Sequence, residues 1–254
     1  MKIVCLNTWG GRAGKEGLLS FFAAHKDDTD IFCLQEIWSA PYSDLEGQKV
    51  GGKDLDHSAI MVNGLQEISE LLAEHAPIFR PHHGDNYGLL MLVKNGIEIL
   101  ADGEVFVHKE KGYIPEGDIG KHARNIQFVT AEHNGAPLTV INFHGLWNGQ
   151  GKGDSEDRIA QSEKIKNFMQ NLQGNIVLCG DFNLEPDTES LRILEGSGLR
   201  NLIRENGITS TRTAHYTGPV KFADYVLVSE TLEVADFQVL PDEVSDHTPL
   251  MLVI

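Results

Sequence analysis

Basic residues are scarce in this 254-residue chain, where 21 lysines and arginines stand against 37 aspartates and glutamates. The formal net charge is −16, and a handful of acidic metal ligands cannot account for an excess of this size. Proteins that bind nucleic acid mainly through its phosphates usually present a basic face. The composition therefore disfavours non-specific DNA binding without excluding it.

Long apolar segments are also missing. No apolar run approaches the roughly 18 residues that a membrane-spanning helix needs, and no basic amphipathic helix indicates docking on a membrane. The strand-like segment Ile3-Val4-Cys5-Leu6 follows Lys2 at once, which leaves no room for a removable signal sequence. We therefore expect a cytoplasmic protein without a membrane partner.

Cysteine is rare, and linker-like sequence is absent. Cys5, Cys33 and Cys179 are odd in number and each lies in an apolar run, which favours buried thiols over disulfides or zinc ligands. No repeat, low-complexity run or stretch rich in proline, glycine and serine divides the chain. With 41% hydrophobic and 23% charged residues, the composition is typical of a globular protein, and we predict one domain over residues 1–254.

Hydrophobic periodicity predicts many strands and few helices. Strands are expected at residues 2–9, 30–38, 222–229 and, with a break at Pro241, 234–254; helices are expected at 15–26, 61–74, 154–172 and 188–195. Asn95-Gly96 and Asn134-Gly135 predict two hairpins, one joining 88–94 to 98–108 and the other joining 125–132 to 138–143. This order predicts an α/β protein in which two mainly antiparallel sheets pack face to face, with helices outside.

Residues 176–183, Ile-Val-Leu-Cys-Gly-Asp-Phe-Asn, place two polar residues directly after a short apolar strand. Because side chains alternate along an extended chain, Asp181 and Asn183 should point the same way and Phe182 should point into the core. A carboxylate that handles water, beside an amide that holds an oxyanion, suits hydrolysis of a phosphate ester. Alone, the same residues also fit an ordinary turn.

Polar residues recur at the ends of other predicted strands. The motifs, in chain order, are Leu6-Asn7-Thr8-Trp9, Leu34-Gln35-Glu36, Asn142-Phe143-His144, Gly180-Asp181-Phe182-Asn183, Ala223-Asp224-Tyr225-Val226 and Ser245-Asp246-His247. Together they resemble the endonuclease/exonuclease/phosphatase superfamily of deoxyribonuclease-I-like, metal-dependent phosphohydrolases. The resemblance spans nearly the whole chain, although Phe143 stands where a small residue is usual and Gly145 where leucine is common.

The resemblance implies a four-layer α/β sandwich and magnesium-dependent hydrolysis of a phosphoester by in-line attack of water. It implies a site for Mg²⁺, with Mn²⁺ as a substitute, at Glu36, Asn7 and Asp246, and magnesium indeed takes hard oxygen ligands. The catalytic residues would be Asp181, which handles the attacking water, and Asn183, which holds a phosphate oxygen.

The same resemblance implies roles for two histidines. His247 would contact the phosphate and transfer a proton, with Asp224 accepting from its other ring nitrogen. His144 and Arg124 would bind the phosphate from the opposite side. The other histidines, such as His82, His83, His122 and His215, are expected on loop surfaces.

Three functions are compatible with these residues. The first is hydrolysis of a small or single-headed phosphodiester or phosphomonoester, and the second is a DNA endonuclease or exonuclease of the same superfamily. The third is a non-catalytic binding protein that retains the fold, which is disfavoured because Glu36, Asp181, Asn183, Asp246 and His247 are all present. No sequence feature indicates the oligomeric state.

Aromatic residues and loops predict a compact substrate pocket. Trp9, Trp38 and Trp147 each follow a proposed site residue within three positions, so they either pack the loop bases or stack on the substrate. Loops at 40–57, 110–122 and 204–221 carry Tyr42, Tyr113 and Tyr216 and are long enough to wall off a pocket. Few bases lie near the site: Lys49, Lys53, Lys109, Lys111, Lys121, Lys152, Arg212 and Lys221. We therefore expect a preference for a small phosphoester over duplex DNA.

Overall fold

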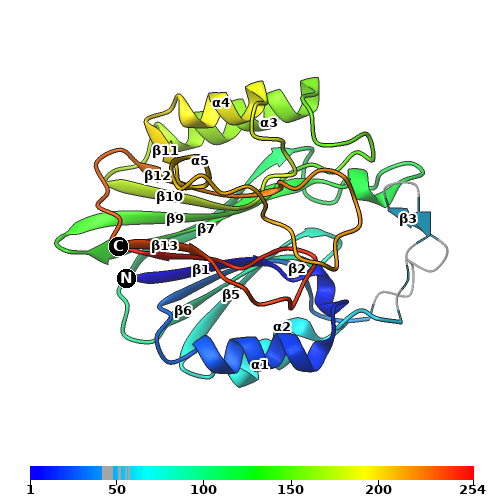
Figure 1. Ribbon diagram of the computed structural model, residues 1–254, viewed down its shortest axis with the longest axis horizontal. Coiled ribbons are helices and arrows are strands. Elements are labelled where there is room, and N and C mark those ends of the chain that lie inside the picture. Colours follow the sequence, from blue (N-terminus) through cyan, green and yellow to red (C-terminus); the bar gives the residue numbers. More distant parts are fainter. Residues whose placement is uncertain (42–47, 51–52, 55, 57) are drawn as a thin grey trace.

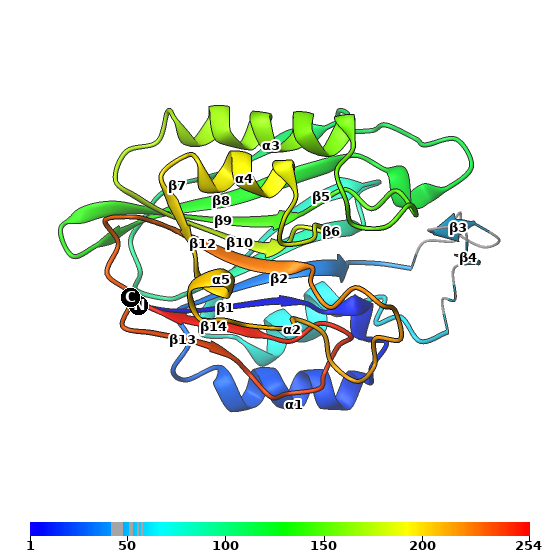
Figure 2. The ribbon, with the colours of Figure 1, turned by 45° about the horizontal axis from the view of Figure 1, so that its top comes forward.

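Two six-stranded sheets face each other, and helices cover the outer face of each sheet (Figures 1 and 2). The computed structural model describes residues 1–41, 48–50, 53–54, 56 and 58–254, so Tyr42 lies outside the described residues. Helices α1 (Lys15–His25) and α2 (Gly64–Leu71) cover one sheet, and α3 (Glu156–Met169) and α4 (Glu189–Glu195) cover the other. The architecture is the predicted four-layer α/β sandwich.

Each of the two large sheets contains six strands. The first sheet contains, in order, β13 (Asp236–Val239), β14 (Leu250–Val253), β1 (Lys2–Asn7), β2 (Ile31–Trp38), β6 (Tyr87–Lys94) and β5 (His75–His83). The second contains β11 (Leu199–Asn201), β12 (Asp224–Ser229), β10 (Asn175–Asp181), β9 (Ala136–His144), β8 (Arg124–His133) and β7 (Ile99–His108). Smaller elements are η1 (Trp9–Gly11), β3 (Lys49–Val50), β4 (Lys53–Asp54), η3 (Ile119–Lys121) and α5 (Leu202–Glu205).

A single parallel pair lies at the centre of each six-stranded sheet, and the other described pairings in these two sheets are antiparallel. The pairs are β1 with β2 and β9 with β10. Asn7 pairs with Gln35 at the end of the first, and His144 pairs with Asp181 at the end of the second. Since parallel strands end at the same edge of a sheet, each pair gathers polar strand ends at one point. The two points face each other across the sandwich, where Asn7 reaches Asp181.

The facing sides of the two sheets form the main apolar core. Ile31, Val140 and Leu178 are fully buried there, and burying such a side chain stabilises the fold by roughly 1.5–3 kcal/mol. Cys5 and Cys33 are register partners on β1 and β2, and Cys179 lies on β10. All three thiols are free and buried, as predicted.

A buried polar bridge joins the sheets just below the strand ends. Nε2 of Gln35 donates to Oδ1 of Asn142 at 2.6 Å. Nδ2 of Asn142 donates to the carbonyl oxygen of Leu34 at 3.0 Å and to Oε1 of Gln127 at 3.2 Å. Because unpaired amides would be costly in this core, the bridge sets the sheets in one relative position.

Helix α3 holds the loop that follows β9. Oγ of Ser155 accepts the backbone N–H of Arg158 and caps the helix, which ends three residues earlier than the predicted 154–172. The buried Arg158 side chain donates to the carbonyl oxygens of Leu146 at 3.2 Å and of Gly151 at 2.8 Å.

No helix in the described parts of the chain is long and apolar enough to cross a membrane.

One predicted hairpin is wrong and one is confirmed. The Asn134-Gly135 turn joins β8 to β9 as expected. The Asn95-Gly96 turn instead carries the chain from β6 in the first sheet to β7 in the second, where β7 pairs with β8. The partner of β6 on that side is β5, which the prediction missed because it contains Pro77 and Pro81. These prolines are tolerated because β5 is an edge strand.

Candidate active site

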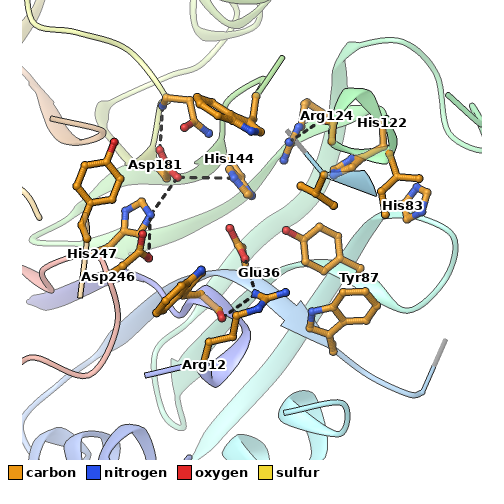
Figure 3. Close-up of a pocket in the computed structure, with 18 of the residues that line it drawn as sticks. Arg12, Glu36, His83, Tyr87, His122, Arg124, His144, Asp181, Asp246 and His247 are labelled. Atoms are coloured by element: carbon orange, nitrogen blue, oxygen red, sulfur yellow. Dashed lines mark hydrogen bonds and ion pairs between the residues drawn. The ribbon is translucent and has the colours of Figure 1, made fainter. Parts of the chain in front are cut away.

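Polar residues at the ends of β2, β9 and β10 line one cavity of about 470 Å³ at one edge of the sandwich. Glu36, His144 and Asp181 enter it from β2, β9 and β10, and Asp246 and His247 enter from the loop before β14 (Figure 3). Residues from both sheets and from both ends of the chain therefore share one cavity. A volume of this size suits a small-molecule ligand.

Asp181 lies at the centre of this group. Its Oδ2 accepts from Nδ2 of Asn7 at 2.9 Å and lies 3.6 Å from Nε2 of His247 and 3.7 Å from Nε2 of His144. Its Oδ1 accepts the backbone N–H of Asn183 at 2.9 Å. Nδ2 of Asn183 donates to the carbonyl oxygen of Gly145 at 3.2 Å. The strand end thus holds the carboxylate in one orientation, facing two imidazoles.

His247 and Asp224 form a buried pair behind the cavity wall. Nδ1 of His247 donates to Asp224, with 2.8 Å to Oδ1 and 2.9 Å to Oδ2. Nε2 is then left facing Asp181 and Asp246, 3.6 Å from a carboxylate oxygen of each. Burial alone would lower the pKa of His247, but the surrounding carboxylates, Asp224 foremost, outweigh burial and raise it. These carboxylates therefore favour the imidazolium form of the ring.

The positive charge of His247 acts in turn on Asp181. Burial alone would raise the pKa of Asp181, but the basic side chains around it, His247 foremost, outweigh burial and lower the pKa. Asp181 is therefore ionised at neutral pH, and its carboxylate can orient a water molecule and accept a proton from it.

The loop that carries His247 is fixed to β1. Oγ of Ser245 donates to the carbonyl oxygen of Asn7 at 2.7 Å and accepts the backbone N–H of His247 at 3.2 Å. On the other side, Oγ1 of Thr211 accepts the backbone N–H of Asp224 at 3.2 Å. These buried hydroxyl groups set the position of the histidine and its carboxylate partner.

Backbone strain is concentrated at the site. Five described residues other than glycine have a positive φ, and three of them line the cavity: Trp9 at 51°, Glu36 at 59° and Asn183 at 53°. A non-glycine residue in this region costs on the order of 1–3 kcal/mol. The surrounding sheets bear this cost, and the backbone turns these side chains into the cavity.

Glu36 and Asp246 offer the carboxylate oxygens of a metal site. Oε2 of Glu36 lies 3.6 Å from Nη1 of Arg12, and Oδ2 of Asp246 accepts from Nη1 of Arg212 at 2.8 Å. Oδ1 of Asp246 is buried and has no hydrogen-bond donor among the described residues. Burial raises the pKa of Glu36, and the negative charge of Asp246 adds to this rise, which Arg12 partly offsets. A divalent cation would relieve both the repulsion and the orphaned oxygen, so the donor set fits Mg²⁺ or Mn²⁺.

Asn7 supports this group from behind. Its Oδ1 accepts the backbone N–H of Trp9 at 2.9 Å, which directs Nδ2 toward Glu36 at 3.3 Å and Asp181 at 2.9 Å. In this orientation Asn7 positions the two carboxylates. Asp181, Asp224 and His247 also bring potential ligand atoms within 4.8 Å of one another, but His247 and Asp224 are hydrogen-bonded to each other.

Arg124 and His144 lie on the other side of Asp181 from His247 (Figure 3). Arg124 is 2% exposed; its Nη2 donates to the carbonyl oxygen of Gly120 at 3.2 Å, while Nε and Nη1 have no partner among the described residues. Burial, together with Arg124, lowers the pKa of His144 well below its ordinary value, so this ring is neutral. The pair thus offers a charged and a neutral donor group to one ligand.

The expectation that His82, His83 and His122 lie on loop surfaces is wrong. All three are buried, at 2%, 8% and 4% exposure, and His83 and His122 line the cavity. His82 and His83 end β5, the strand that the prediction missed. His122 stands two positions before Arg124, and this shared parity is a signal that could have placed it in the site.

Two of the candidate basic residues reach the cavity. Nζ of Lys152 donates to the carbonyl oxygen of Phe222 at 3.0 Å, and burial lowers its pKa to about 8. The Arg212 guanidinium lies 4.3 Å from the centre of the Tyr216 ring, which also lines the cavity. Arg12, absent from the prediction, lines it too, and its Nη1 donates to the carbonyl oxygen of Trp9.

All three tryptophans line the cavity, as do residues of the predicted loop walls. Trp38 is 5% exposed and packs on Tyr87 with ring centroids 4.8 Å apart, whereas Trp9 and Trp147 are half-buried. Tyr113 is 38% exposed and does not contribute to the cavity.

Comparison with known proteins places the chain in a family. The model of the Endonuclease/Exonuclease/phosphatase family matches residues 4–247, from β1 to His247. The chain belongs to this family. As a member of the endonuclease/exonuclease/phosphatase family it is a phosphoester hydrolase. Among curated proteins, none matches the chain in sequence.

Solved structures of the family share the fold. A mannosyl-6-phosphatase from Bacteroides thetaiotaomicron VPI-5482 is 16% identical, with a TM-score of 0.72 over 100% of this chain and 98% of that chain. A family protein from Leptotrichia buccalis C-1013-b is 19% identical, with a TM-score of 0.73 over 100% and 99%. D. rerio TDP2 complexed with a single-strand DNA product is 15% identical, with a TM-score of 0.68 over 99% and 97%.

Proposed function

We propose that this protein uses a divalent cation, Mg²⁺ or Mn²⁺, to hydrolyse a small or single-headed phosphoester by in-line attack of water. One observation carries the proposal: Glu36, Asp181, Asn183, Asp246 and the Asp224–His247 pair converge on one cavity of small-molecule size. A non-catalytic binding protein would not need an ionised carboxylate facing an imidazolium at 3.6 Å.

Asp181 is the residue suited to the attacking water. Its Oδ2 is fixed by Asn7 at 2.9 Å and can orient the water and accept its proton as the bond to phosphorus forms. Asn183 holds a non-bridging phosphate oxygen without adding negative charge. His247 balances negative charge on the phosphate and can donate its own Nε2 proton to the leaving oxygen, while Asp224 favours the protonated ring through Nδ1.

Glu36 and Asp246 would hold the cation, with Asn7 supporting Glu36. The cation would neutralise charge that develops on the phosphate and the leaving oxygen. On the opposite side, Arg124 and His144 would bind phosphate oxygens; Arg124 has two unpartnered guanidinium nitrogens within the described chain.

The distribution of charge supports a small substrate. Lys152 and Arg212 line the cavity, but Lys109 lies over the Tyr113 ring and Lys111 is 3.9 Å from Glu104. Neither of these two lysines lines the cavity. A long polyanion needs a line of phosphate contacts and would meet the field of a chain with net charge −16.

A substrate panel tests this proposal. Small phosphomonoesters, small phosphodiesters, single-stranded DNA and duplex DNA would be assayed with Mg²⁺, with Mn²⁺ and with EDTA. The panel includes monoesters because one structural neighbour is a mannosyl-6-phosphatase, and DNA because another was solved with a DNA product. Glu36→Gln serves as the inactive variant and Glu163→Gln, on the exposed side of α3, as its matched control.

We expect metal-dependent hydrolysis of small esters that EDTA and Glu36→Gln abolish and Glu163→Gln retains. Efficient cleavage of DNA with a steep salt dependence would favour the nuclease function. Failure of the folded protein to hydrolyse any ester of the panel with metal present would favour the non-catalytic alternative.

A further inference from the structure

One side of the cavity, away from His247 and Asp246, is built from rings (Figure 3). The His122 ring lies 5.1 Å from His83 and 5.6 Å from Tyr87, and Trp38 packs 4.8 Å from Tyr87. Trp38 belongs to a small apolar cluster with Ile60 and Ile119 that is separate from the main core. We call His83, Tyr87, His122 and Trp38 the aromatic wall.

The aromatic wall is held rigidly from behind by His82. The His82 and His122 rings stack with centroids 4.9 Å apart and planes 22° apart. Nδ1 of His82 lies 2.9 Å from Oδ1 of Asn125, and the Asn125 amide nitrogen donates to Oε2 of Glu104 at 2.7 Å. This bond fixes the amide, so His82 must donate from Nδ1 and cannot turn without losing a buried hydrogen bond.

His122 presents a neutral ring with a free acceptor. Its Nδ1 lies 2.8 Å from the carbonyl oxygen of Ala123, which can only accept, so Nδ1 carries the proton. Nε2 makes no hydrogen bond within the described residues and belongs to a ring that lines the cavity. Burial, reinforced by Arg124, lowers the pKa of His122 well below its ordinary value. The wall therefore does not supply cations to a second phosphate.

We propose that the aromatic wall binds an uncharged, flat ring in the organic part of the substrate, stacked on His83 and donating a hydrogen bond from its edge to Nε2 of His122. This inference rests on the proposed function and names its substrate class, a phosphoester of a nucleoside-like alcohol. The phosphate lies at the charged side, among Asp181, His247 and the proposed cation ligands. A cavity of about 470 Å³ has room for one phosphate and one ring system.

A matched pair of esters tests whether the aromatic wall recognises a ring in the substrate. Adenosine 5′-phosphate and ribose 5-phosphate share the same primary ester and differ by the base, so the ratio of their kcat/KM measures recognition of the ring. We expect the wild-type protein to prefer the adenosine ester by at least about tenfold, in line with the usual strength of base stacking. Equal values, or a preference for the ribose ester, would overturn the proposal.

Variants of the wall separate stacking from hydrogen bonding. His122→Ala removes the acceptor and the ring contact and should reduce the preference by about tenfold, whereas His122→Phe keeps a flat ring without the acceptor and should retain part of the preference. His83→Ala removes the stacking ring and should reduce the preference independently. His133→Ala, at the distant β8–β9 turn, is the matched control and should keep the wild-type ratio. Thermal unfolding of each variant identifies any that fail to fold.

Binding without turnover distinguishes failure of this inference from failure of the proposed function. Adenosine and ribose would be titrated into the protein in EDTA, with tryptophan fluorescence and calorimetry as readouts. Adenosine binding that His122→Ala weakens about tenfold supports the aromatic wall even if no ester is hydrolysed. Hydrolysis of small esters without any binding of adenosine would refute the wall and leave the phosphohydrolase assignment intact.

Discussion

Acid should destabilise the protein through the histidines buried beside the site, and His82 is the clearest case. Its side chain is 2% exposed, stacks on His122 and donates to Asn125. Burial, reinforced by the charge of Arg124, lowers the pKa of His82 from 6.5 to about 3.

The direction of the effect follows from proton linkage. Between these two pKa values the unfolded chain binds a proton at this ring and the folded chain does not, so the free energy of unfolding falls as the pH falls. The contribution of His82 is fully present above about pH 6.5 and is lost progressively toward pH 3. For one such ring, the loss between about pH 7.5 and about pH 5 is about 2 kcal/mol.

Urea unfolding of the wild-type protein and of His82→Gln in EDTA would measure this contribution. Glutamine keeps a donor for Asn125 but cannot titrate, so the wild type should lose about 2 kcal/mol more than the variant over this pH range. The raised pKa of His247 changes stability in the opposite direction, but equally in both proteins. His25→Gln, at the half-buried last residue of α1, should keep the wild-type loss. Equal losses in wild type and His82→Gln would refute the reasoning.

Three further predictions concern catalysis, and a fourth concerns packing. Glu36→Gln and His247→Ala should each lose at least about two orders of magnitude in rate with unchanged circular dichroism; near-normal activity of Glu36→Gln in magnesium would contradict the metal assignment. Asp224→Asn should lower kcat at least about tenfold with little change in KM, because an amide does not stabilise the imidazolium; steady-state kinetics decides this. A small phosphoester should be cleaved far more efficiently than duplex DNA at each of several salt concentrations. Gly180→Ala should lower stability by at least about 3 kcal/mol in thermal or urea unfolding, because its methyl would lie 1.8 Å from the carbonyl oxygen of Phe143.

The sequence by itself determined the features that depend on neighbouring residues. Alternation of side chains predicted that Asp181 and Asn183 would share a side while Phe182 pointed to the core; both polar residues line the cavity and Phe182 is 1% exposed. The Asn134-Gly135 turn was predictable because a two-residue turn fixes a local hairpin. Six short motifs in order were enough to indicate the family, since each motif is a strand end that retains its chemistry.

Only the tertiary structure decided which strands and side chains meet. Asn95-Gly96 has the same turn chemistry as Asn134-Gly135, but β6 and β7 pair in different sheets, because pairing depends on partners distant in sequence. Sequence also could not distinguish a surface histidine from a buried one. His82, His83 and His122 meet because β5 and the segment before β8 pack at the same edge, and burial there, with Arg124, keeps His82 and His122 neutral. The protonation state of His82 and His122 is thus a property of the fold, since it depends on how much water the surrounding chain excludes.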